Sequence, residues 1–230
     1  MDRRRNPGRS PVTRLLPDIY DARFDEREVS AKDAVWREIV RYLQRYVDSD
    51  APLLDVACDR GHFVRWVRAR ERWATDIRDV SASLPEDVRF LQASGLDLGA
   101  NAPSGHFGTI FMSNYLEHLE SGDAVIDQLR VANSLLRPGG RVIVLQPNIR
   151  LIGSRYWDFI DHRVALTERS LLEAAELAGL RTTELVTRFL PYSTKGRLPA
   201  HPGLVRAYLA FRPAWWLMGK QTLYVGEPRS

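Results

Sequence analysis

The sequence predicts an α/β fold in which helices cover both faces of a doubly wound, mostly parallel sheet. Short apolar runs alternate along the chain with segments of helical periodicity, which is typical of strand–helix–strand units with right-handed crossovers. The first run, 52–56, is apolar except for Asp55, as expected of a strand buried on both faces of a parallel sheet. It leads through a turn ending at Gly61 into a helical segment, so we place the start of the sheet here.

The first half of the chain predicts a long helix, a short helix and three strands. Ser30 is placed to cap the long helix over 30–47, where apolar residues fall at helical spacing on one face. The segment 48–52, with two aspartates and a proline, ends this helix. The other elements expected here are a helix over 63–70 and strands over 52–56, 72–77 and 88–91.

The second half predicts four strands and two helices. Pro138 and the two glycines after it stop the helix that begins near Asp123. Thr167 caps the next helix, and Gly179 ends it in a left-handed conformation. The expected elements are strands over 107–112, 141–145, 182–190 and 221–225, helices over 123–136 and 167–178, and an insertion over 191–220.

Charge is distributed unevenly along the 230 residues, although 44% hydrophobic and 27% charged residues are typical of a soluble globular protein. Residues 1–14 contain five arginines and one aspartate, which accounts for the whole formal net charge of +4. We therefore expect a basic flexible tail over 1–18, followed by a single domain over 19–230. The balanced charge of that domain argues against a specific nucleic-acid-binding surface.

Cys58 is the single cysteine, which excludes an internal disulfide and a cysteine-based zinc site within one chain. Such cysteine usage is typical of the reducing cytoplasm. The arginine-rich start is followed by no signal-peptide core, and no apolar run approaches the roughly 20 residues of a membrane-spanning helix. We expect a cytoplasmic protein, with peripheral contact at the inner membrane face left open.

Ligands of doubly wound sheets bind beyond the carboxyl ends of the strands, and this rule locates a candidate site. The turn after the first strand directs backbone N–H groups and a helix N-terminus at a ligand, while Asp55 can accept hydrogen bonds from an ammonium group. The site therefore suits a cationic or zwitterionic ligand better than a bare pyrophosphate. The segments that follow the first five strands are Asp55–Gly61, Asp76–Ile77, Ser94–Leu96, Ser113–His118 and the residues from Pro147 onward.

Four segments resemble motifs of one enzyme family. Leu54-Asp55-Val56-Ala57-Cys58-Asp59-Arg60-Gly61 stands where class I S-adenosylmethionine-dependent methyltransferases have a hydrophobic-Asp-x-Gly-x-Gly-x-Gly turn, and Asp76 matches the acid that closes their second strand. Residues 107–119 and 135–144 are similar to their strand-four and strand-five motifs. The resemblance covers about residues 35–190 and is to the type 11 group. The segment 156–162 resembles enzymes of bacterial glycan or glycolipid biosynthesis.

The resemblance implies a Rossmann-like, seven-stranded methyltransferase sheet with an antiparallel last strand, and S-adenosyl-L-methionine as cofactor. By this resemblance, the turn from Asp55 to Gly61 holds the methionine end, Asp76 binds both ribose hydroxyls and Ile77 packs on the adenine. Backbone groups of residues 94–96 contact the adenine edge. The expected cofactor-binding residues are Asp55, Ala57, Cys58, Gly61, Asp76, Ile77, Ser94, Gly95, Leu96, Ser113 and Asn114.

The chain departs from the family pattern at three positions. Ala57 and Asp59 replace two turn glycines, and Asp59 adds a side chain where backbone normally approaches the ligand. Ser94 replaces the acid that follows strand three near the adenine amino group. A catalytically silent binding subunit of the same fold is therefore the alternative to an active enzyme. A nicotinamide-dependent dehydrogenase would need a Gly-x-Gly-x-x-Gly turn, which residues 57–62 lack.

Methylation of a hydroxyl is assisted by a base, and histidine titrates in the appropriate pH range. The candidate catalytic residues are His118, which follows strand four, and His162, which Asp161 can orient. The alternatives are that His118 only braces its loop and that His162 is a solvated loop residue. No pair of residues has metal-ligand spacing, so no metal site is predicted. The remaining histidines are expected to be structural: His62, His106 and His201.

We expect S-adenosylmethionine-dependent O-methylation of a small-molecule, saccharide or lipid-linked acceptor. The aromatic insertion over 191–220 has several interpretations. It can be a lid whose aromatic rings stack on a sugar or lipid, or a segment that lies on a membrane interface. It can also be an apolar cluster that packs on the domain or on a second copy in a homodimer.

Overall fold

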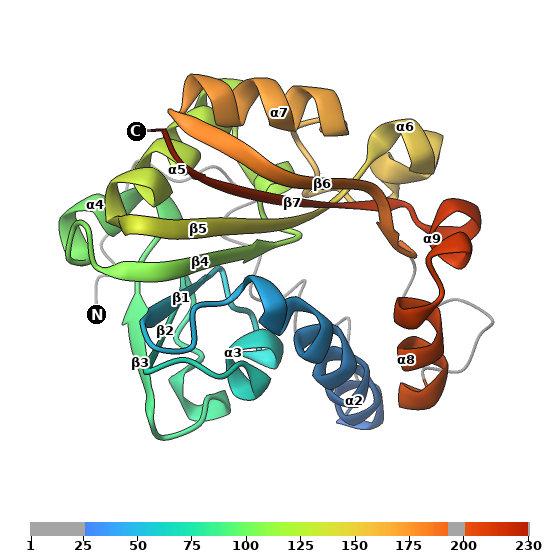
Figure 1. The fold of residues 1–230 in the computed structure, drawn as a ribbon, viewed down its shortest axis with the longest axis horizontal. Coiled ribbons are helices and arrows are strands. Elements are labelled where there is room, and N and C mark those ends of the chain that lie inside the picture. The colour runs from blue at the N-terminus through green and yellow to red at the C-terminus, as the bar shows by residue number, and fades with distance from the viewer. Residues whose placement is uncertain (1–25, 193–200, 230) are drawn as a thin grey trace, which may run out of the picture.

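The structure is a computed structural model that describes residues 26–192 and 201–229. A twisted sheet runs through the middle of this part of the chain, with helices on both faces (Figure 1). The expected basic tail over 1–18 lies outside the described residues, as does the segment 193–200 of the expected insertion. None of the helices within the described ranges is long and apolar enough to cross a membrane.

The sheet has the strand order β3-β2-β1-β4-β5-β7-β6. Neighbouring strands from β3 to β5 pair in parallel, whereas β7 is antiparallel to both β5 and β6. This topology confirms the expected Rossmann-like methyltransferase sheet with an antiparallel last strand. The strands are β1 (Pro52–Val56), β2 (Glu71–Asp76), β3 (Val88–Gln92), β4 (Phe107–Ser113), β5 (Leu136–Pro147), β6 (Leu180–Leu190) and β7 (Gln221–Pro228).

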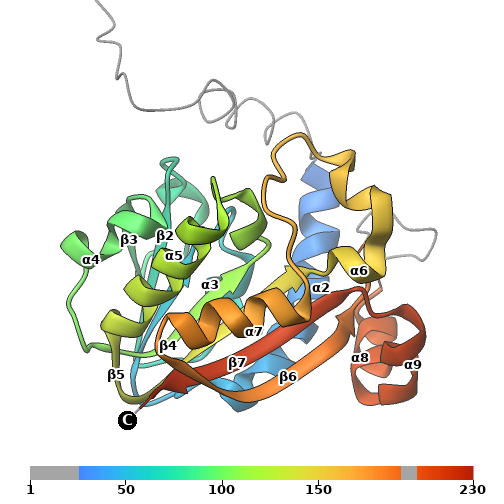
Figure 2. The ribbon, with the colours of Figure 1, turned by 90° about the horizontal axis from the view of Figure 1, so that it is seen from above.

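The longer helices divide between the two faces of the sheet. α5 and α7 cover one face, whereas α2, α3, α8 and α9 pack on the other (Figures 1 and 2). The α-helices are α2 (Glu26–Leu43), α3 (His62–Trp66), α4 (Leu98–Asn101), α5 (Gly122–Leu135), α6 (Ile149–Ile152), α7 (Glu168–Leu177), α8 (Pro202–Ala210) and α9 (Arg212–Met218). The 3-10 helices are η1 (Gln44–Tyr46), η2 (Ser81–Ser83), η3 (Gly95–Asp97), η4 (Leu116–His118) and η5 (Gly153–Asp158).

Alternation of side chains along the strands builds an apolar core on each face. Leu54 of β1 and Ile110 of β4 belong to the core beneath α5 and α7. Their neighbours Leu53 and Phe111 belong to the core beneath α2 and α3. The Phe111 ring stacks on Phe63 of α3, with the ring centroids 3.6 Å apart. The apolar runs in the sequence therefore become central strands whose carboxyl ends share one edge of the sheet.

Three helix boundaries differ from the prediction by four residues. α2 ends at Leu43 rather than at 47, where the chain continues as the 3-10 helix η1. α2 begins at Glu26 rather than at 30, because residues 26–29 continue the helical pattern, so Ser30 lies inside the helix instead of capping it. α3 ends at Trp66 rather than near 70, because Val67 is extended, with ψ of 145°. The capping box at Thr167 and the left-handed Gly179 (φ 78°) agree with the prediction for α7.

The start of β5 also differs from the prediction. Leu136 already pairs with Phe107 of β4, and pairing resumes at Arg141 with Thr109. The intervening Pro-Gly-Gly segment forms an irregularity within the ladder, where Gly139 adopts φ of 75°. α5 ends before these glycines, at Leu135, because Leu136 is extended, with ψ of 137°. The glycines permit the irregularity, and the strand is longer at its amino end than predicted.

The described part of the 191–220 insertion forms α8 and α9, which pack beside α2. Arg206 of α8 makes a bidentate ion pair with Glu38 of α2, with N–O distances of 2.7 and 2.9 Å. Leu209 and Trp215 join the core on the α2 face. These contacts favour the interpretation of an apolar cluster on the domain. Four large apolar side chains of α8–α9 and their junction are exposed nonetheless: Leu204, Phe211, Trp216 and Leu217.

Candidate functional site

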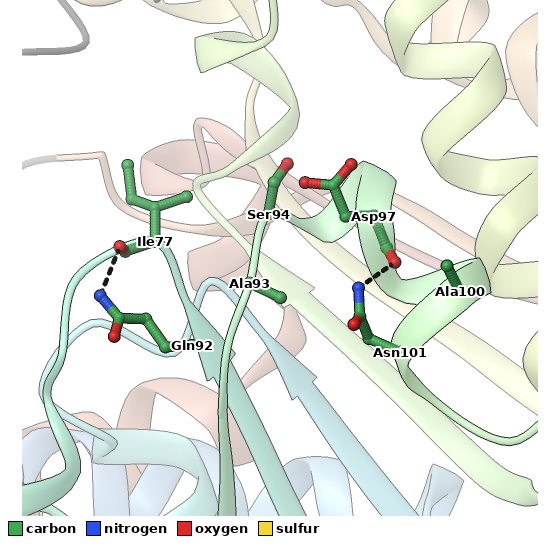
Figure 3. Close-up of a pocket in the computed structure, with 7 residues that line it drawn as sticks. All are labelled: Ile77, Gln92, Ala93, Ser94, Asp97, Ala100 and Asn101. Carbon is green, nitrogen blue, oxygen red and sulfur yellow. Dashed lines mark hydrogen bonds between the residues drawn. The ribbon is translucent and has the colours of Figure 1, made fainter. Parts of the chain in front are cut away.

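A pocket of about 410 Å³ opens beyond the carboxyl ends of β2 and β3 (Figure 3). Ile77 and Ser94, two of the residues expected at the adenine, lie on its wall. Gln92 supports the rim, because its side-chain amide donates to the carbonyl oxygen of Ile77 at 3.3 Å. The pocket lining is Ile77, Gln92, Ala93, Ser94, Asp97, Ala100 and Asn101.

Asp97 supplies this pocket with an acid that the sequence analysis missed. The Ser94 hydroxyl accepts a hydrogen bond from the Leu96 amide and starts the 3-10 turn that carries Asp97. The turn brings Asp97 to the pocket wall, although it lies three residues beyond the position at which family members carry their acid. The signal was present in the sequence, because an acid one turn after a capping serine lies on the same side of that turn.

Gly95 and Leu96 are not part of the pocket wall. A Cβ atom on Gly95 would lie 2.3 Å from Oε1 of Gln128 and 2.5 Å from the Tyr115 hydroxyl, which are hydrogen-bonded to each other. Glycine is thus required there for close packing of the turn on α5. Leu96 is 37% exposed.

The turn after β1 keeps a left-handed backbone at three alternate positions although only one of them is glycine. Ala57, Asp59 and Gly61 have φ of 55°, 51° and 73°. Neighbouring strands hold this path, because the Cys58 amide donates to the Thr75 carbonyl at 2.9 Å. Left-handed conformations are strained for alanine and less so for aspartate. The two residues that replace turn glycines therefore adopt the left-handed conformation that glycine favours.

Asp55 is a buried carboxylate beneath this turn. Its side chain is 3% exposed, and Oδ2 has no hydrogen-bond partner among the described residues. Burial raises the pKa of Asp55 well above its usual value, although a hydrogen bond from the Val64 amide opposes the shift, and the nearby Asp76 and Asp59 charges raise it further. A buried acid with one unpartnered oxygen, beside other acids, suits a cationic group such as the ammonium of a methionine moiety.

Cys58, between these acids, has a packing role. It is 7% exposed and contacts Val64 and Ala74 in a small apolar cluster. Burial, with the charges of the neighbouring aspartates, raises the pKa of its thiol far above the usual range, so the thiolate is not formed at neutral pH.

Asp76, the expected ribose ligand, lies in a network of charges. Its Oδ2 accepts a hydrogen bond from the Asp59 amide at 3.1 Å, and the Arg78 guanidinium contacts both of its oxygens. Asp59 turns its side chain to Arg78, at 2.8 Å, and to Lys32 of α2, at 3.8 Å. Burial raises the pKa of Asp59, but the charges of Lys32 and Arg78 outweigh it and hold the pKa below its usual value. Arg78 and Lys32 were not singled out in the sequence.

Ser113 and Asn114 lie at the carboxyl end of β4, beside the turn after β1. Asn114 has φ of 48°, and its amide N–H donates to the Leu145 carbonyl of β5 at 2.9 Å. Its side-chain amide donates to the Ser113 hydroxyl, also at 2.9 Å. The 3-10 helix η4 follows directly after this turn.

The two histidines predicted to be catalytic are brought together by the fold. The rings of His118 and His162 have centroids 5.0 Å apart. His118 Nδ1 lies 3.0 Å from the Asp161 carbonyl oxygen, and because a carbonyl only accepts, Nδ1 carries the proton of this hydrogen bond. The Asp161 carboxylate is 3.6 Å from the same nitrogen of His118. Asp161 therefore orients His118, a role that the sequence analysis gave it toward His162.

Glu117 completes this cluster and was not predicted. It is 1% exposed, and burial raises its pKa to about 7, against the charge of His118, which lowers the pKa. Its side chain and those of His118 and His162 place one potential ligand atom each within 4.8 Å of one another. The adjacent Glu-His pair after strand four was the signal available in the sequence.

Backbone hydrogen bonds hold the two loops of the cluster together. The Glu117 carbonyl accepts from the amides of Arg163 and Val164, at 2.8 and 3.1 Å. The Tyr156 hydroxyl donates to the Val164 carbonyl at 2.6 Å, and the Tyr156 ring contacts His162 at a centroid distance of 4.7 Å. The position of His162 is thus set by contacts with the loop that follows β4.

The other three histidines lie away from this cluster. His62 Nδ1 is 3.1 Å from Asp33 of α2, which fixes α3 against that helix. His106 packs by its edge on Trp73 and Phe107 at the amino end of β4. His201 caps α8 by accepting from the Gly203 amide.

Comparison with known proteins agrees with the fold described above. A family model described as a methyltransferase domain matches residues 27–185. No curated protein matches the chain. The fold is similar to a chain in the complex of the Haloferax volcanii Trm112 methyltransferase activator with a methyltransferase (TM-score 0.65, 16% identity, 90% of this chain and 95% of that chain).

Two S-adenosylmethionine-dependent methyltransferases are also similar in fold. One, from Archaeoglobus fulgidus, has a TM-score of 0.60 and 14% identity over 83% of this chain and 93% of its own. The other, from Clostridium acetobutylicum, has a TM-score of 0.59 and 15% identity over 95% of this chain and 100% of its own. The family match covers more than half of the sequence, in the same segments that carry the motifs. The chain therefore belongs to the methyltransferase domain family, as a class I S-adenosyl-L-methionine-dependent methyltransferase.

Proposed function

We propose that this enzyme methylates a hydroxyl oxygen of a small-molecule or saccharide-type acceptor. The observation that carries the proposal is the cluster of Glu117, His118 and His162 beyond the carboxyl end of β4. A hydroxyl must lose its proton as it is methylated, and these side chains are placed to promote that loss. An amine that is already neutral would not need such a cluster.

The residues at the sheet edge fit the cofactor in three parts. The unpartnered Oδ2 of Asp55 would accept from the ammonium of the methionine moiety. Asp76 would bind the ribose hydroxyls, and the pocket beside Ile77 would take the adenine, with Asp97 near its amino group. S-adenosyl-L-methionine, when bound, supplies a methyl group on a positively charged sulfur.

The enzyme's part in catalysis is then to position the acceptor and to promote loss of its proton. Alignment of oxygen, methyl carbon and sulfur is the main requirement of an in-line transfer. His118 is held by Asp161, and His162 by the loop that binds Glu117, so both rings are oriented before the acceptor binds. The ring of Phe159, which lies beside His162 and is 37% exposed, offers an apolar face against which a sugar ring can lie.

The proposal is tested by two measurements on the full chain. Calorimetric titration with S-adenosylmethionine is expected to show one site per chain. Incubation with isotope-labelled cofactor and a panel of saccharides, glycolipid precursors and simple diols is expected to give a methyl ether, located by mass spectrometry. Methylation only of amines or carbon atoms across the panel would overturn O-methylation.

A second candidate function is that of a silent binding subunit. It is favoured by the engagement of Asp76 with Arg78 and Asp59, which the ribose hydroxyls would have to share. The similarity to a chain from a complex with a methyltransferase activator adds to this candidate. Absence of cofactor binding by calorimetry, with a chain that melts cooperatively, would favour the subunit over the enzyme.

A further inference from the structure

His118 presents a lone pair to a carboxylate. Because Nδ1 donates to the Asp161 carbonyl, Nε2 of the neutral ring is an acceptor. This Nε2 lies 3.9 Å from Oε1 of Glu117. His118 is 20% exposed and Glu117 only 1%, so a positive charge between these two atoms, either a proton or a metal ion, would stabilise the buried carboxylate.

The Glu117 carboxylate lacks the contacts that normally stabilise a buried acid. Neither Oε1 nor Oε2 has a hydrogen-bond partner among the described residues, and the side chain is 1% exposed. Buried carboxylates in proteins are paired, hydrogen-bonded or bound to metal. A single proton shared with His118 would satisfy only one of its two oxygens.

His162 supplies a third potential ligand at the same place. One donor atom from each of Glu117, His118 and His162 lies within 4.8 Å of the other two. Metal–ligand bonds of about 2.0–2.2 Å need donors roughly 3–4 Å apart, so small side-chain rotations close the site. The contact of His118 Nδ1 with a backbone carbonyl is the outer-shell arrangement usual for metal-bound histidine.

We propose that Glu117, His118 and His162 bind a divalent transition-metal ion. Two imidazoles and one carboxylate suit Mn²⁺, Fe²⁺, Co²⁺ or Zn²⁺ better than Mg²⁺ or Ca²⁺, which prefer oxygen ligands. Three protein ligands leave coordination positions open. This inference rests on the proposed function in one respect, that the open positions take two neighbouring oxygens of the acceptor, as in a vicinal diol of a sugar.

With a metal bound, the two histidines have a different role from the catalytic one predicted from the sequence. They act as ligands, and the metal lowers the pKa of the acceptor hydroxyl. The O–H bond breaks with its electron pair left on oxygen, and the proton passes to solvent water. Sequence spacing did not reveal the site because His118 and His162 follow different strands and meet only through the hydrogen bonds between their loops.

Metal binding is tested without cofactor or acceptor, with Co²⁺ and Zn²⁺ alone as probes. The full chain is stripped with a chelator and titrated by calorimetry, and Co²⁺ absorption reports the ligand environment. We expect one ion per chain. Glu117→Gln and His162→Asn are expected to weaken Co²⁺ binding by at least about 100-fold, beyond the loss seen for outer-shell changes.

Controls separate metal binding from folding. His106→Gln removes a histidine at the opposite end of β4 and is expected to leave Co²⁺ affinity unchanged. Glu117→Gln relieves a buried, unpartnered carboxylate, so the metal-free variant is expected to melt no lower than the parent. No stoichiometric Co²⁺ or Zn²⁺ binding by the parent, or equal affinity in the parent and both ligand variants, overturns the proposal.

The titrations also separate this inference from the proposed function. Cofactor binding with no metal binding overturns the metal site and leaves the methyltransferase assignment in place. Methylation of isolated hydroxyls but not of diols, with metal bound, overturns the diol part alone. Metal binding that depends on Glu117 and His162 supports the site even if the methylated atom proves to be nitrogen.

Discussion

Arg78 covers both carboxylate oxygens of Asp76, with Nε 3.1 Å from Oδ1 and Nη2 3.2 Å from Oδ2. The same guanidinium also reaches Asp59, at 2.8 Å, so one cation connects the residue expected to bind ribose to the residue that replaces a turn glycine. Burial lowers the pKa of Arg78, but the hydrogen bonds and charges of the two aspartates outweigh it and raise the pKa. Ribose hydroxyls bound at Asp76, as proposed, would share this acid with a permanent cation.

The first prediction concerns this acid. Asp76→Asn is expected to weaken S-adenosylmethionine binding by about 10- to 100-fold, because a hydrogen bond to a charged group contributes about 1.5–3 kcal/mol. Calorimetry on the full chain measures the change. Asp79→Asn is the matched control, because within the described part of the chain Asp79 accepts hydrogen bonds from Ser81 alone and lies outside the pocket lining. Equal affinity of the Asp76 variant and the parent would show that the ribose binds elsewhere.

The second prediction concerns the left-handed turn. Ala57→Gly removes the strain of φ 55° but adds flexibility to the unfolded chain, so we expect a net gain of about 0.5–1 kcal/mol in the free energy of unfolding. Gly61→Ala is expected to lose about 1–2 kcal/mol, because its φ is 73° and a Cβ would lie 2.3 Å from Cδ2 of Leu84. Urea unfolding checks both. Two changes of the same sign would contradict the prediction.

The third prediction concerns the pH dependence of stability. The pKa of Asp55 is raised in the folded state, so between its unfolded and folded pKa values the native chain binds more protons than the unfolded chain. Stability contributed by this group therefore falls as pH rises through that window. Asp55→Asn is expected to be more stable than the parent at neutral pH, with a smaller decline from pH 4 to pH 7.

The same variant is expected to bind S-adenosylmethionine more weakly, because the ammonium loses its carboxylate partner. Stability and affinity thus change in opposite directions. Urea unfolding at several pH values and calorimetry measure the two effects. A variant that is less stable than the parent at neutral pH would indicate that Asp55 braces the turn.

The fourth prediction compares two adjacent tryptophans on α9. Trp215 is 4% exposed, and its indole N–H donates to the Tyr208 carbonyl at 2.8 Å. Trp215→Ala is expected to cost about 3–5 kcal/mol. Trp216 is 75% exposed, so Trp216→Ala is expected to change stability by less than about 0.5 kcal/mol.

Trp216 also tests whether the exposed face of α9 has a partner. Reduced binding to anionic vesicles in Trp216→Ala, with unchanged melting, would support the peripheral membrane contact that the sequence analysis left open. Reduced self-association, measured by sedimentation, would support a homodimer instead. Equal behaviour of parent and variant in both assays would argue against either partner at this face.

The strands were predictable because each apolar run that is buried on both faces leaves a continuous signal in the sequence. The location of Asp55 and Asp76 was predictable for the same reason, because a residue near the carboxyl end of a central strand lies at that edge of the sheet. Glu117, Asp97 and Arg78 were not found. Their importance comes from contacts between loops, and local pattern does not encode which loops meet.

The two histidines show that the position of a residue in the sequence does not reveal its neighbours in space. His118 and His162 were each predicted from their own place in the sequence, whereas the structure places them side by side through hydrogen bonds accepted by the carbonyl oxygens of Glu117 and Asp161. Similarly, Ser94 stands where family members have an acid, but Asp97, one turn later, places a carboxylate in the same pocket. Single-residue departures from a motif can therefore be offset by neighbours in space.

The backbone at Ala57 and Asp59 has a consequence for recognising distant relatives. Amide contacts to β2, from Cys58 to Thr75 and from Asp59 to Asp76, impose the path of the loop from outside. Glycine at these positions would lower the strain of the left-handed conformation, but it is not required for the loop to follow this path. A motif search that requires glycine at these positions would miss chains such as this one. A search for the acids at the ends of β1 and β2, combined with the strand order, would find them.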